Sequence, residues 1–587
     1  MPKSSKYIVP AIFSLIAVAL YCFWAIPYRA AMGYREELQL FQTTAAYFAG
    51  LMAVPGGMAV YIGEFCTQFF NNYMIGAAVM AGIMTAFMLL CYAIIGRQAP
   101  RVPKPLRLAF SFIPLLSLWL TLGNQNVTLA FPVALIMVVG AALVHSCASR
   151  TRLRGVLLML VLTSLLYWLA GPAACVLTLL IIITAVRQIR YNESIQPALR
   201  SAAMAVAAVI WLGLNIWIWS LRSAYPFTYQ LLGTGYLLEP GVCSPGIVIT
   251  MILTAAVSLP AMLLWRVKLK IALPALMAAE AAAALLIYPK AWPEATYRLI
   301  DYDYMVRAND WEGILRYSDR HDPDLPLSVS ATNLALAMTG QLDARAFDYY
   351  QNGPGGLIPS FRKESISSWL TGEIFFQLGL VNSAQRFYFE GMEAIPNFNK
   401  SARAMKRLAE TAMLRGDYEV AEKYLRILQN TLFYGKWATR TLALIRNPKE
   451  IDSHPLYGAL RRRMIDDDAL FSDANLDGFL ARLYTRDPGN DVARQYLIVY
   501  PLMERDLAGF AEYMALVAGQ RPEYNPPLAQ QALAFMAMKS GRELPANAVP
   551  PAVEQSLRGF AQAWTSKNQA LIDGYRRTLF YYLLSDE

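Results

Sequence analysis

The chain has 587 residues, of which 56% are hydrophobic, and it carries a formal net charge of +10. This apolar content exceeds that of ordinary soluble proteins and excludes a single small soluble domain. The basic excess lies in the first half, where residues 1–288 hold 18 Lys and Arg, six Glu and no Asp. We therefore expect a membrane protein that does not bind nucleic acid.

Nine apolar segments of near-spanning length follow one another in this half. They lie at residues 8–28, 73–96, 105–122, 127–147, 155–170, 173–187, 200–221, 246–265 and 271–288. A helix needs roughly 20 residues to cross a bilayer, and loops rich in Lys and Arg stay in the cytoplasm. With a cytoplasmic N-terminus, 15 of the 18 basic residues fall inside. The pattern predicts nine spans.

The first outer loop, residues 29–72, contains a run at 43–62 that is apolar enough to resemble another span. A crossing there would turn every later basic loop outward. Because Pro55, Gly56 and Gly57 interrupt the run, we expect in-plane or re-entrant helices. Ten spans with an outer N-terminus are the alternative.

The same loop holds three of the six acidic residues of this half, namely Glu36, Glu37 and Glu64. A carboxylate at the membrane surface can act as a general base or bind a divalent cation. The alternative for Glu36 and Glu37 is a solvated pair at a helix start. A further carboxylate, Glu280, lies inside the last apolar segment, where it is either functional or hydrogen-bonded across a helix interface.

The outer loop at 221–245 brings Arg222, Tyr225 and Tyr229 to the same side of the membrane. An arginine there can bind a lipid phosphate or a carboxylate of the first loop. The tyrosines either contact substrate or anchor the loop at the interface.

Beyond residue 288 the composition becomes that of a soluble helical protein, and the first Asp is Asp301. We expect a transmembrane domain at 1–288 and an extracytoplasmic domain at 289–587. The second domain has the small and aromatic residues of a tetratricopeptide repeat, at Gly372, Phe375, Gly379, Ala384, Tyr388, Gly391 and Pro396. A second copy follows at Ala409, Ala412, Gly416 and Ala421. The predicted fold class is all-α, with transmembrane helices followed by an α-solenoid that binds an acceptor or a protein partner.

Three pieces of sequence carry a family resemblance: Glu-Leu-Gln-Leu-Phe at 37–41, Pro-Gly-Gly at 55–57 with Thr-Gln-Phe-Phe at 67–70, and Asp-Trp-Glu-Gly-Ile-Leu at 310–315. With these pieces and this layout, the chain resembles a family of uncharacterised bacterial inner-membrane proteins over most of its length. We therefore expect a cytoplasmic membrane protein whose N-terminus is cytoplasmic and whose C-terminal domain is periplasmic.

The layout is also loosely similar to the GT-C class of glycosyltransferases. Those enzymes have an internal N-terminus, a first outer loop with in-plane helices and catalytic carboxylates, many spans and often an outer C-terminal domain. They commonly have Asp in that loop, whereas this chain has Glu36 and Glu37. The resemblance implies transfer of a glycan from a lipid-linked donor. Glu36 or Glu37 would act as base or cation ligand with Glu64 in support, and Arg35 and Arg222 would hold phosphate.

Two other functions stay open. A non-enzymatic scaffold would recruit envelope or secretion components through the repeats, although nine spans exceed what an anchor needs. A transporter would use Glu280, but the chain has no visible inverted repeat. The sequence has no HExxH, paired CxxC, GxSxG or phosphate-loop motif, so we expect neither a zinc enzyme nor a nucleotide hydrolase.

Overall fold

The computed structural model describes residues 7–148, 152–191, 195–222, 227–232, 235–239, 242, 244–260, 268–465, 468, 476–541 and 549–585. Within these ranges every regular element is a helix, and one isolated β-bridge joins Val127 to Leu237. The predicted all-α class is therefore confirmed.

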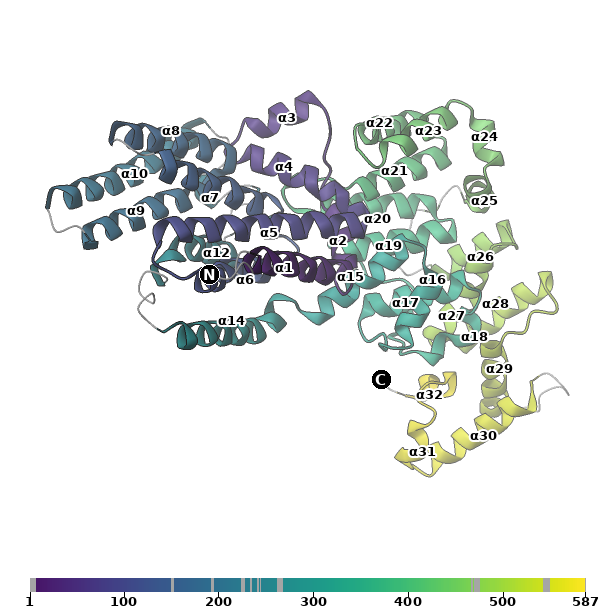
Figure 1. Ribbon diagram of the computed structural model, residues 1–587. Helices are drawn as coiled ribbons and strands as arrows, with labels where there is room; N and C mark the ends of the chain where they lie inside the picture. Colours follow the sequence, from purple (N-terminus) through teal and green to yellow (C-terminus); the bar gives the residue numbers. More distant parts are fainter. Residues whose placement is uncertain are drawn as a thin grey trace. The chain divides into compact units, whose positions relative to one another are not determined.

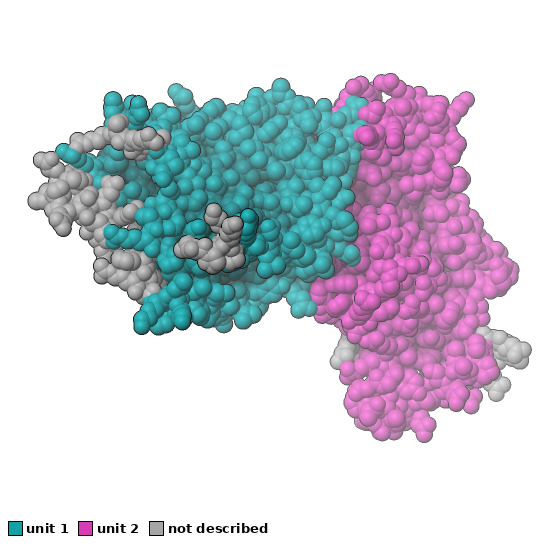
Figure 2. Space-filling model, in the orientation of Figure 1, with its two compact units in different colours: residues 1–297, 395–402, 429–435 teal, residues 298–394, 403–428, 436–587 magenta. Residues whose placement is uncertain are grey.

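The chain forms two compact units, which Figure 2 shows in different colours. The first contains residues 1–297, 395–402 and 429–435, and the second contains residues 298–394, 403–428 and 436–587. Two short segments from the later part of the chain thus belong with its first half. The change of unit at 297/298 comes shortly after the expected domain boundary at 288/289.

Nine helices of 12 to 28 residues run through the described part of the first unit (Figure 1). They are α1 (Ile8–Ala25), α5 (Tyr73–Gln98), α6 (Lys104–Thr121), α7 (Ala130–Ala148), α8 (Arg152–Ala170), α9 (Ala174–Tyr191), α10 (Ile195–Arg222), α12 (Pro245–Ala256) and α14 (Leu269–Ala291). Shorter elements join them: α2 (Arg29–Glu37), α3 (Ala45–Met52), α4 (Gly57–Thr67), η2 (Gln68–Asn71), η3 (Gly171–Ala173) and α11 (Phe227–Leu232). Each predicted apolar segment coincides with one of the nine helices where it is described.

Within the described residues, six segments are long and apolar enough to cross a membrane. They are Ile8–Ala25, Tyr73–Gln98, Ala130–Cys147, Leu153–Val186, Leu199–Arg222 and Leu269–Ala291. The fourth segment includes both α8 and α9, which η3 separates. Leu285 and Leu286 of α14 are 77% and 76% exposed, and such an apolar surface needs lipid around it. The chain is therefore a membrane protein, while the count of nine spans stays a prediction.

Contacts at the helix ends show that long helices consecutive in the chain alternate in direction. Phe23 near the end of α1 packs against Trp119 of α6 and Trp292 after α14, so the C-terminal ends of these three helices meet. At the opposite end of the bundle, Arg97 of α5 donates to the carbonyl oxygen of Ser146 in α7 at 3.3 Å. That opposite end also carries Arg101, Lys104, Arg107, Lys268 and Lys270, and we call it the basic end. Residues 29–72 follow α1 and precede α5, so they lie at the other end.

The apolar run at 43–62 forms two short helices, α3 and α4, rather than one spanning helix. Gly56 before α4 has a φ of +87°, which favours glycine. A Cβ atom on Gly57 would lie 1.8 Å from the Leu51 carbonyl oxygen, so this position also requires glycine. We call residues 51–57 the elbow. The interruption expected at Pro55, Gly56 and Gly57 is present, and the position of the elbow relative to a bilayer stays a prediction.

The described part of the second unit is built from short helices that follow one another closely (Figure 1). They are α15 (Glu294–Arg307, which begins in the first unit), α16 (Trp311–Ser318), α17 (Pro326–Met338), α18 (Leu342–Arg345), η4 (Ala346–Asp348), η5 (Gly353–Gly356), α19 (Ser365–Leu378), α20 (Val381–Glu393), α21 (Ala402–Arg415), α22 (Tyr418–Gln429), α23 (Gly435–Ile445), α24 (Pro448–Ser453), α25 (Pro455–Arg463), α26 (Leu476–Arg486), α27 (Asp491–Met503), α28 (Leu507–Gln520), α29 (Pro527–Ser540), α30 (Pro551–Thr565), α31 (Gln569–Asp573) and α32 (Leu579–Leu584), while η6 (Pro396–Phe398) belongs to the first unit.

Helices α19 and α20 pack closely through the small residues that the sequence pattern marks. A Cβ atom on Gly372 would lie 2.8 Å from the Tyr388 ring, and one on Gly391 would lie 2.7 Å from the Trp369 ring. Gly379 ends α19 with a φ of +100°. The small residues therefore have a packing role, while the assignment of tetratricopeptide repeats and of a solenoid stays a prediction.

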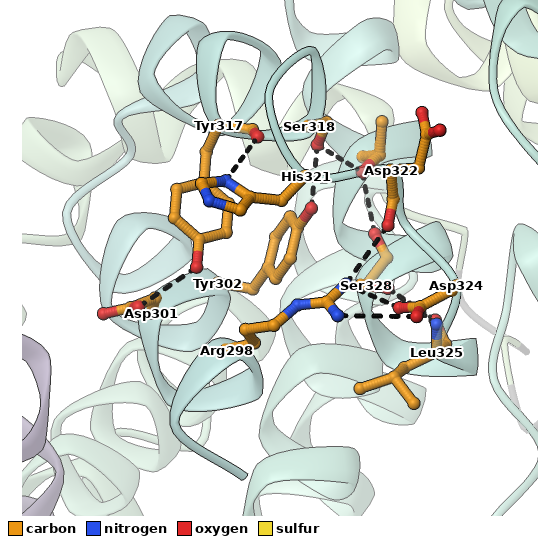
Figure 3. A network of polar contacts seen from close by, with 11 residues as sticks. Arg298, Asp301, Tyr302, Tyr317, Ser318, His321, Asp322, Asp324, Leu325 and Ser328 are labelled. Atoms are coloured by element: carbon orange, nitrogen blue, oxygen red, sulfur yellow. Dashed lines mark hydrogen bonds and ion pairs between the residues drawn. The ribbon is translucent and has the colours of Figure 1, made fainter. Parts of the chain in front are cut away.

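A chain of hydroxyl groups connects α15, α16 and α17 inside the second unit (Figure 3). The Tyr302 hydroxyl lies 3.0 Å from Ser318 Oγ, which lies 2.8 Å from Thr332 Oγ1. Beside this chain, Tyr317 donates to Asp301 at 3.2 Å. Because these buried hydroxyls have partners, the cluster stabilises the packing of the three helices.

Candidate functional site

Glu36 and Glu37 form the last turn of α2, and both are buried, with exposed fractions of 6% and 1%. A helix C-terminus carries a partial negative charge, so carboxylates are unfavourable there, and burial adds a further cost. The two residues are therefore not a solvated pair at a helix start. Because they face the protein interior, Glu36 and Glu37 are candidates for a site inside the first unit.

Glu36 lines a small cavity of about 10 Å³ within the first unit, and Glu64 of α4 lines the same cavity. Around them lie Gln39, Thr67, Gln68, Thr431 and Tyr434 together with four less polar residues. The sequence-predicted carboxylates Glu36 and Glu64 are thus brought together. Glu37 is absent from the lining of this cavity and of the two neighbouring cavities described below.

Each of the two cavity carboxylates accepts a hydrogen bond from a tyrosine. The Tyr434 hydroxyl donates to Glu36 Oε2 at 3.4 Å, and the Tyr47 hydroxyl donates to Glu64 Oε2. Burial raises the pKa of Glu64 to about 7, and the bond from Tyr47 opposes this rise. A carboxyl group with this pKa exchanges protons readily near neutral pH.

A second cavity of about 120 Å³ adjoins the first, since Gln39 and Glu64 line both. Leu51, Val54, Val60 and Leu237 give it an apolar wall, and Asn397 and Asn399 add amide groups. The buried Oε1 atom of Gln39 has no hydrogen-bond partner among the residues that the structure describes. This orphan acceptor lies where the two cavities meet, so it is available to a ligand that donates a hydrogen bond.

Arg35 fastens α2 to the turn that follows α6. Its guanidinium donates to the carbonyl oxygens of Val127 at 2.6 Å, Asn124 at 3.2 Å and Leu122. The side chain is 4% exposed, and burial lowers the pKa of Arg35 to about 10, so it stays charged at neutral pH. A third cavity, of about 10 Å³, borders Arg35 and shares Gln39 with the other two. These contacts position the glutamate-bearing turn of α2.

The remaining predicted binding residues lie elsewhere or outside the described residues. Arg222 is exposed at the C-terminal end of α10, and Tyr229 is half-buried in α11. Neither residue lines any of the three cavities. Tyr225 lies outside the described residues. The structure therefore does not group Arg222 and Tyr229 with Glu36 and Glu64.

Among the residues that sequence reasoning missed are Gln39 and Tyr434, which line the cavities, and Tyr47, which donates to Glu64. Gln39 belongs to the Glu-Leu-Gln-Leu-Phe piece, which is a local signal that could have marked it. Tyr47 lies 17 positions before Glu64 in the same loop. Tyr434 lies 398 positions after Glu36, and nothing in the local sequence indicates that contact.

The described residues contain no group of three or more His, Cys, Asp and Glu that is arranged to hold a metal ion. Glu36 and Glu64 line one cavity, however, and Mg²⁺ is often held by one or two carboxylates with substrate phosphate and water. If a divalent cation is used, these two carboxylates are the protein ligands that fit it.

Neither the search of curated proteins nor the search of solved structures gave a match for this chain. A family model matches residues 3–586, which confirms the resemblance to an uncharacterised family that the sequence pieces at 37–41, 55–57 and 310–315 indicated. The chain belongs to the family of unknown function DUF6057.

Proposed function

We propose that this protein is an integral membrane transferase that moves a sugar or glycan from a lipid-linked donor to an acceptor hydroxyl. The observation that carries the proposal is the pair Glu36 and Glu64, which line one cavity and are each hydrogen-bonded by a tyrosine. Two carboxyl groups with different surroundings can divide proton transfer and orientation between them.

In this mechanism Glu64 is the general base. Its carboxylate takes the proton of the acceptor hydroxyl while the acceptor oxygen bonds to the anomeric carbon of the donor. The bond from that carbon to the donor phosphate oxygen breaks, and the lipid phosphate leaves with the electron pair. A pKa of about 7 lets Glu64 accept the proton and release it afterwards to water. Glu36 and Gln39 orient hydroxyl groups of the sugar.

The proposal includes a location and an orientation. The cavities lie at the end of the bundle opposite the basic end, and Lys and Arg loops are retained in the cytoplasm. The site therefore opens toward the outer face of the cytoplasmic membrane, and nine spans connect a cytoplasmic N-terminus to a periplasmic C-terminal domain. The tetratricopeptide-like helices of that domain bind the acceptor or a partner protein.

Membrane vesicles that contain the protein test this function. Radiolabelled nucleotide sugars supplied to such vesicles label their lipid-linked sugars, and transfer from lipid to acceptor is then followed over time. Glu64→Gln and Glu36→Gln should lose transfer at unchanged protein levels and with a melting temperature no lower than that of the wild type. Glu239→Gln is the matched control, because Glu239 is an exposed carboxylate in the 235–239 loop at the same end of the bundle. It should transfer as the wild type does.

The competing function is a non-enzymatic scaffold, and the same variants separate the two. A scaffold needs the fold but not a proton acceptor in the cavity. If Glu36→Gln, Glu64→Gln and the double variant all support normal growth of a deletion strain, the transferase is wrong and the scaffold is favoured.

A further inference from the structure

A groove of about 520 Å³ runs between α8 and α10 on the outside of the helix bundle. Trp168, Trp211 and Trp219 line it together with Leu160, Ser164 and Asn215, and we call it the tryptophan groove. The groove lies on helices that are apolar enough to span a membrane, so its surroundings are lipid. Its ligand therefore has an apolar part.

The polar atoms of the groove are mostly occupied by contacts within the protein. Trp211 Nε1 lies 3.0 Å from both the Leu160 carbonyl oxygen and Ser164 Oγ. Asn215 Nδ2 donates to the Trp211 carbonyl oxygen at 2.8 Å. These bonds fix the indole of Trp211 between the two helices, so the groove is preformed and presents mainly rings and methyl groups.

The groove is continuous with the elbow beside the carboxylate cavities. Trp168 Nε1 donates to the Met52 carbonyl oxygen at 3.0 Å, and the Gly56 amide donates to the Trp168 carbonyl oxygen at 2.8 Å. On its other side the elbow contributes Leu51 and Val54 to the 120 Å³ cavity. The elbow is thus a wall that the groove and this cavity share, and a molecule with its chain in the groove has its polar end beside the elbow.

We propose that the tryptophan groove binds the isoprenoid chain of the lipid-linked substrate. This inference rests on the proposed function, and it assigns the apolar part of the donor to α8 and α10. A single flexible chain fits a one-sided groove that shares the elbow with a polar cavity, whereas a bulk phospholipid gains nothing from the cavity beyond the elbow. The isoprenoid lipid is therefore held in preference to bulk lipid.

Photolabelling of the full-length protein in nanodiscs tests the site. The probe is a polyprenyl phosphate that carries a diazirine in its chain, and mass spectrometry locates the adducts. We expect adducts on α8 and α10, competition by unlabelled polyprenyl phosphate, and no competition by phosphatidylglycerol. Equal competition by both lipids, or adducts spread evenly over the lipid-facing helices, would overturn the proposal.

Two matched variants make this test specific. Val161→Trp places a bulky side chain in the groove, at a residue that is 60% exposed. Leu286→Trp places one on α14, outside the groove, at a residue that is 76% exposed. Neither change should unfold the protein, which its melting temperature checks. Labelling of α8 and α10 should fall to background in Val161→Trp and stay unchanged in Leu286→Trp. Persistent labelling of α8 and α10 in a folded Val161→Trp variant would contradict binding of the lipid chain in the groove.

The groove and the proposed function can fail separately. Glu64→Gln should be labelled like the wild type, because Glu64 lies beyond the elbow. If the wild type is labelled in the groove but shows no transfer, the groove binds the lipid and the transferase proposal is wrong. If the wild type transfers glycan but is not labelled in the groove, the transferase proposal stands and the lipid site in the groove is wrong.

Discussion

The Tyr434 hydroxyl donates to Glu36 Oε2 at 3.4 Å, although the two residues are 398 positions apart. Neighbouring residues reinforce this approach, since the Thr43 amide donates to the Asn430 carbonyl oxygen at 2.9 Å. Residues 429–435 connect α22 to α23, yet they form a wall of the carboxylate cavity. The cavity therefore requires the later part of the chain.

Tyr434→Phe should weaken the site while leaving the fold intact. The ring stays in place and one long hydrogen bond is lost, so the free energy of unfolding should fall by about 1 kcal/mol or less. Transfer in the vesicle assay should fall, because Glu36 is no longer oriented. Tyr350→Phe, at a residue that is 59% exposed, is the control and should change neither quantity. A variant with full transfer activity would show that the hydroxyl has no part in the site.

The contact between α4 and α7 depends on Gly63. A Cβ atom there would lie 2.5 Å from the Ala130 backbone nitrogen, whereas one on Gly50 of α3 would have no atom within 4 Å. Gly63→Ala should lower the free energy of unfolding by about 1–3 kcal/mol. Gly50→Ala should raise it by up to about 1 kcal/mol, because alanine favours the helix. Melting curves in detergent check both, and equal shifts would contradict the close approach.

Local sequence patterns predicted much of the fold but only part of the site. Long apolar runs mark helices wherever they occur, and Pro55-Gly56-Gly57 marks the elbow, because both signals depend on neighbouring residues alone. The choice between Glu36 and Glu37 depends on the rotation of α2, since adjacent residues point about 100° apart on a helix. That rotation is set by Arg35, whose partners are backbone carbonyl groups and leave no signature in the sequence.

The grouping of Arg222 with the carboxylates shows a second limit. Topology tells on which side of the membrane a loop lies, but it says nothing of its position within the membrane plane. Arg222 and Glu36 both occur in loops assigned to the outer side. Glu36 lines a cavity, whereas Arg222 lines none of the three. Contacts such as that of Tyr434 have no local signal at all.

Arg35→Lys should destabilise the protein although the charge is kept. One ammonium group on a flexible chain cannot reach three carbonyl oxygens in the geometry that the planar guanidinium uses. Loss of charged hydrogen bonds should cost about 1.5–3 kcal/mol. Arg222→Lys, at an exposed position, should change the free energy of unfolding by less than about 0.5 kcal/mol. Similar melting temperatures for both variants would contradict the fastening role of Arg35.

The two ends of the bundle should react with a membrane-impermeant thiol reagent from opposite sides. Arg101→Cys and Lys268→Cys lie at the basic end, and Asn124→Cys lies in the turn at the other end; all three positions are exposed. In a background that lacks all six native cysteines, intact cells should label Asn124→Cys alone. The other two should require permeabilised cells. Labelling of Arg101→Cys in intact cells would show that the orientation in the membrane is opposite to the proposed one.

The stability of the protein should depend on pH through Glu64. Burial raises its pKa from an ordinary 4.5 to about 7, so the folded state favours the protonated form. A group of this kind stabilises the fold fully below pH 4.5, and this contribution is lost as the pH rises through 7. Glu64→Gln cannot ionise and keeps its contribution at every pH. The melting temperature of Glu64→Gln minus that of the wild type should therefore increase between pH 4.5 and 7 and then level off. Because Glu64 is half-buried, we expect a total difference on the order of 1–2 kcal/mol.

Tyr47→Phe provides the control for this titration. The Tyr47 hydroxyl lowers the pKa of Glu64 through its hydrogen bond, so its removal should raise that pKa further. The pH at which stability falls should then be higher in Tyr47→Phe than in the wild type. In the double variant Tyr47→Phe/Glu64→Gln this pH dependence of stability should be absent. A difference between Glu64→Gln and the wild type that stays constant from pH 4.5 to 8 would mean that Glu64 does not titrate in this range. The carboxyl group would then lack the proton exchange near neutral pH that the general-base role requires.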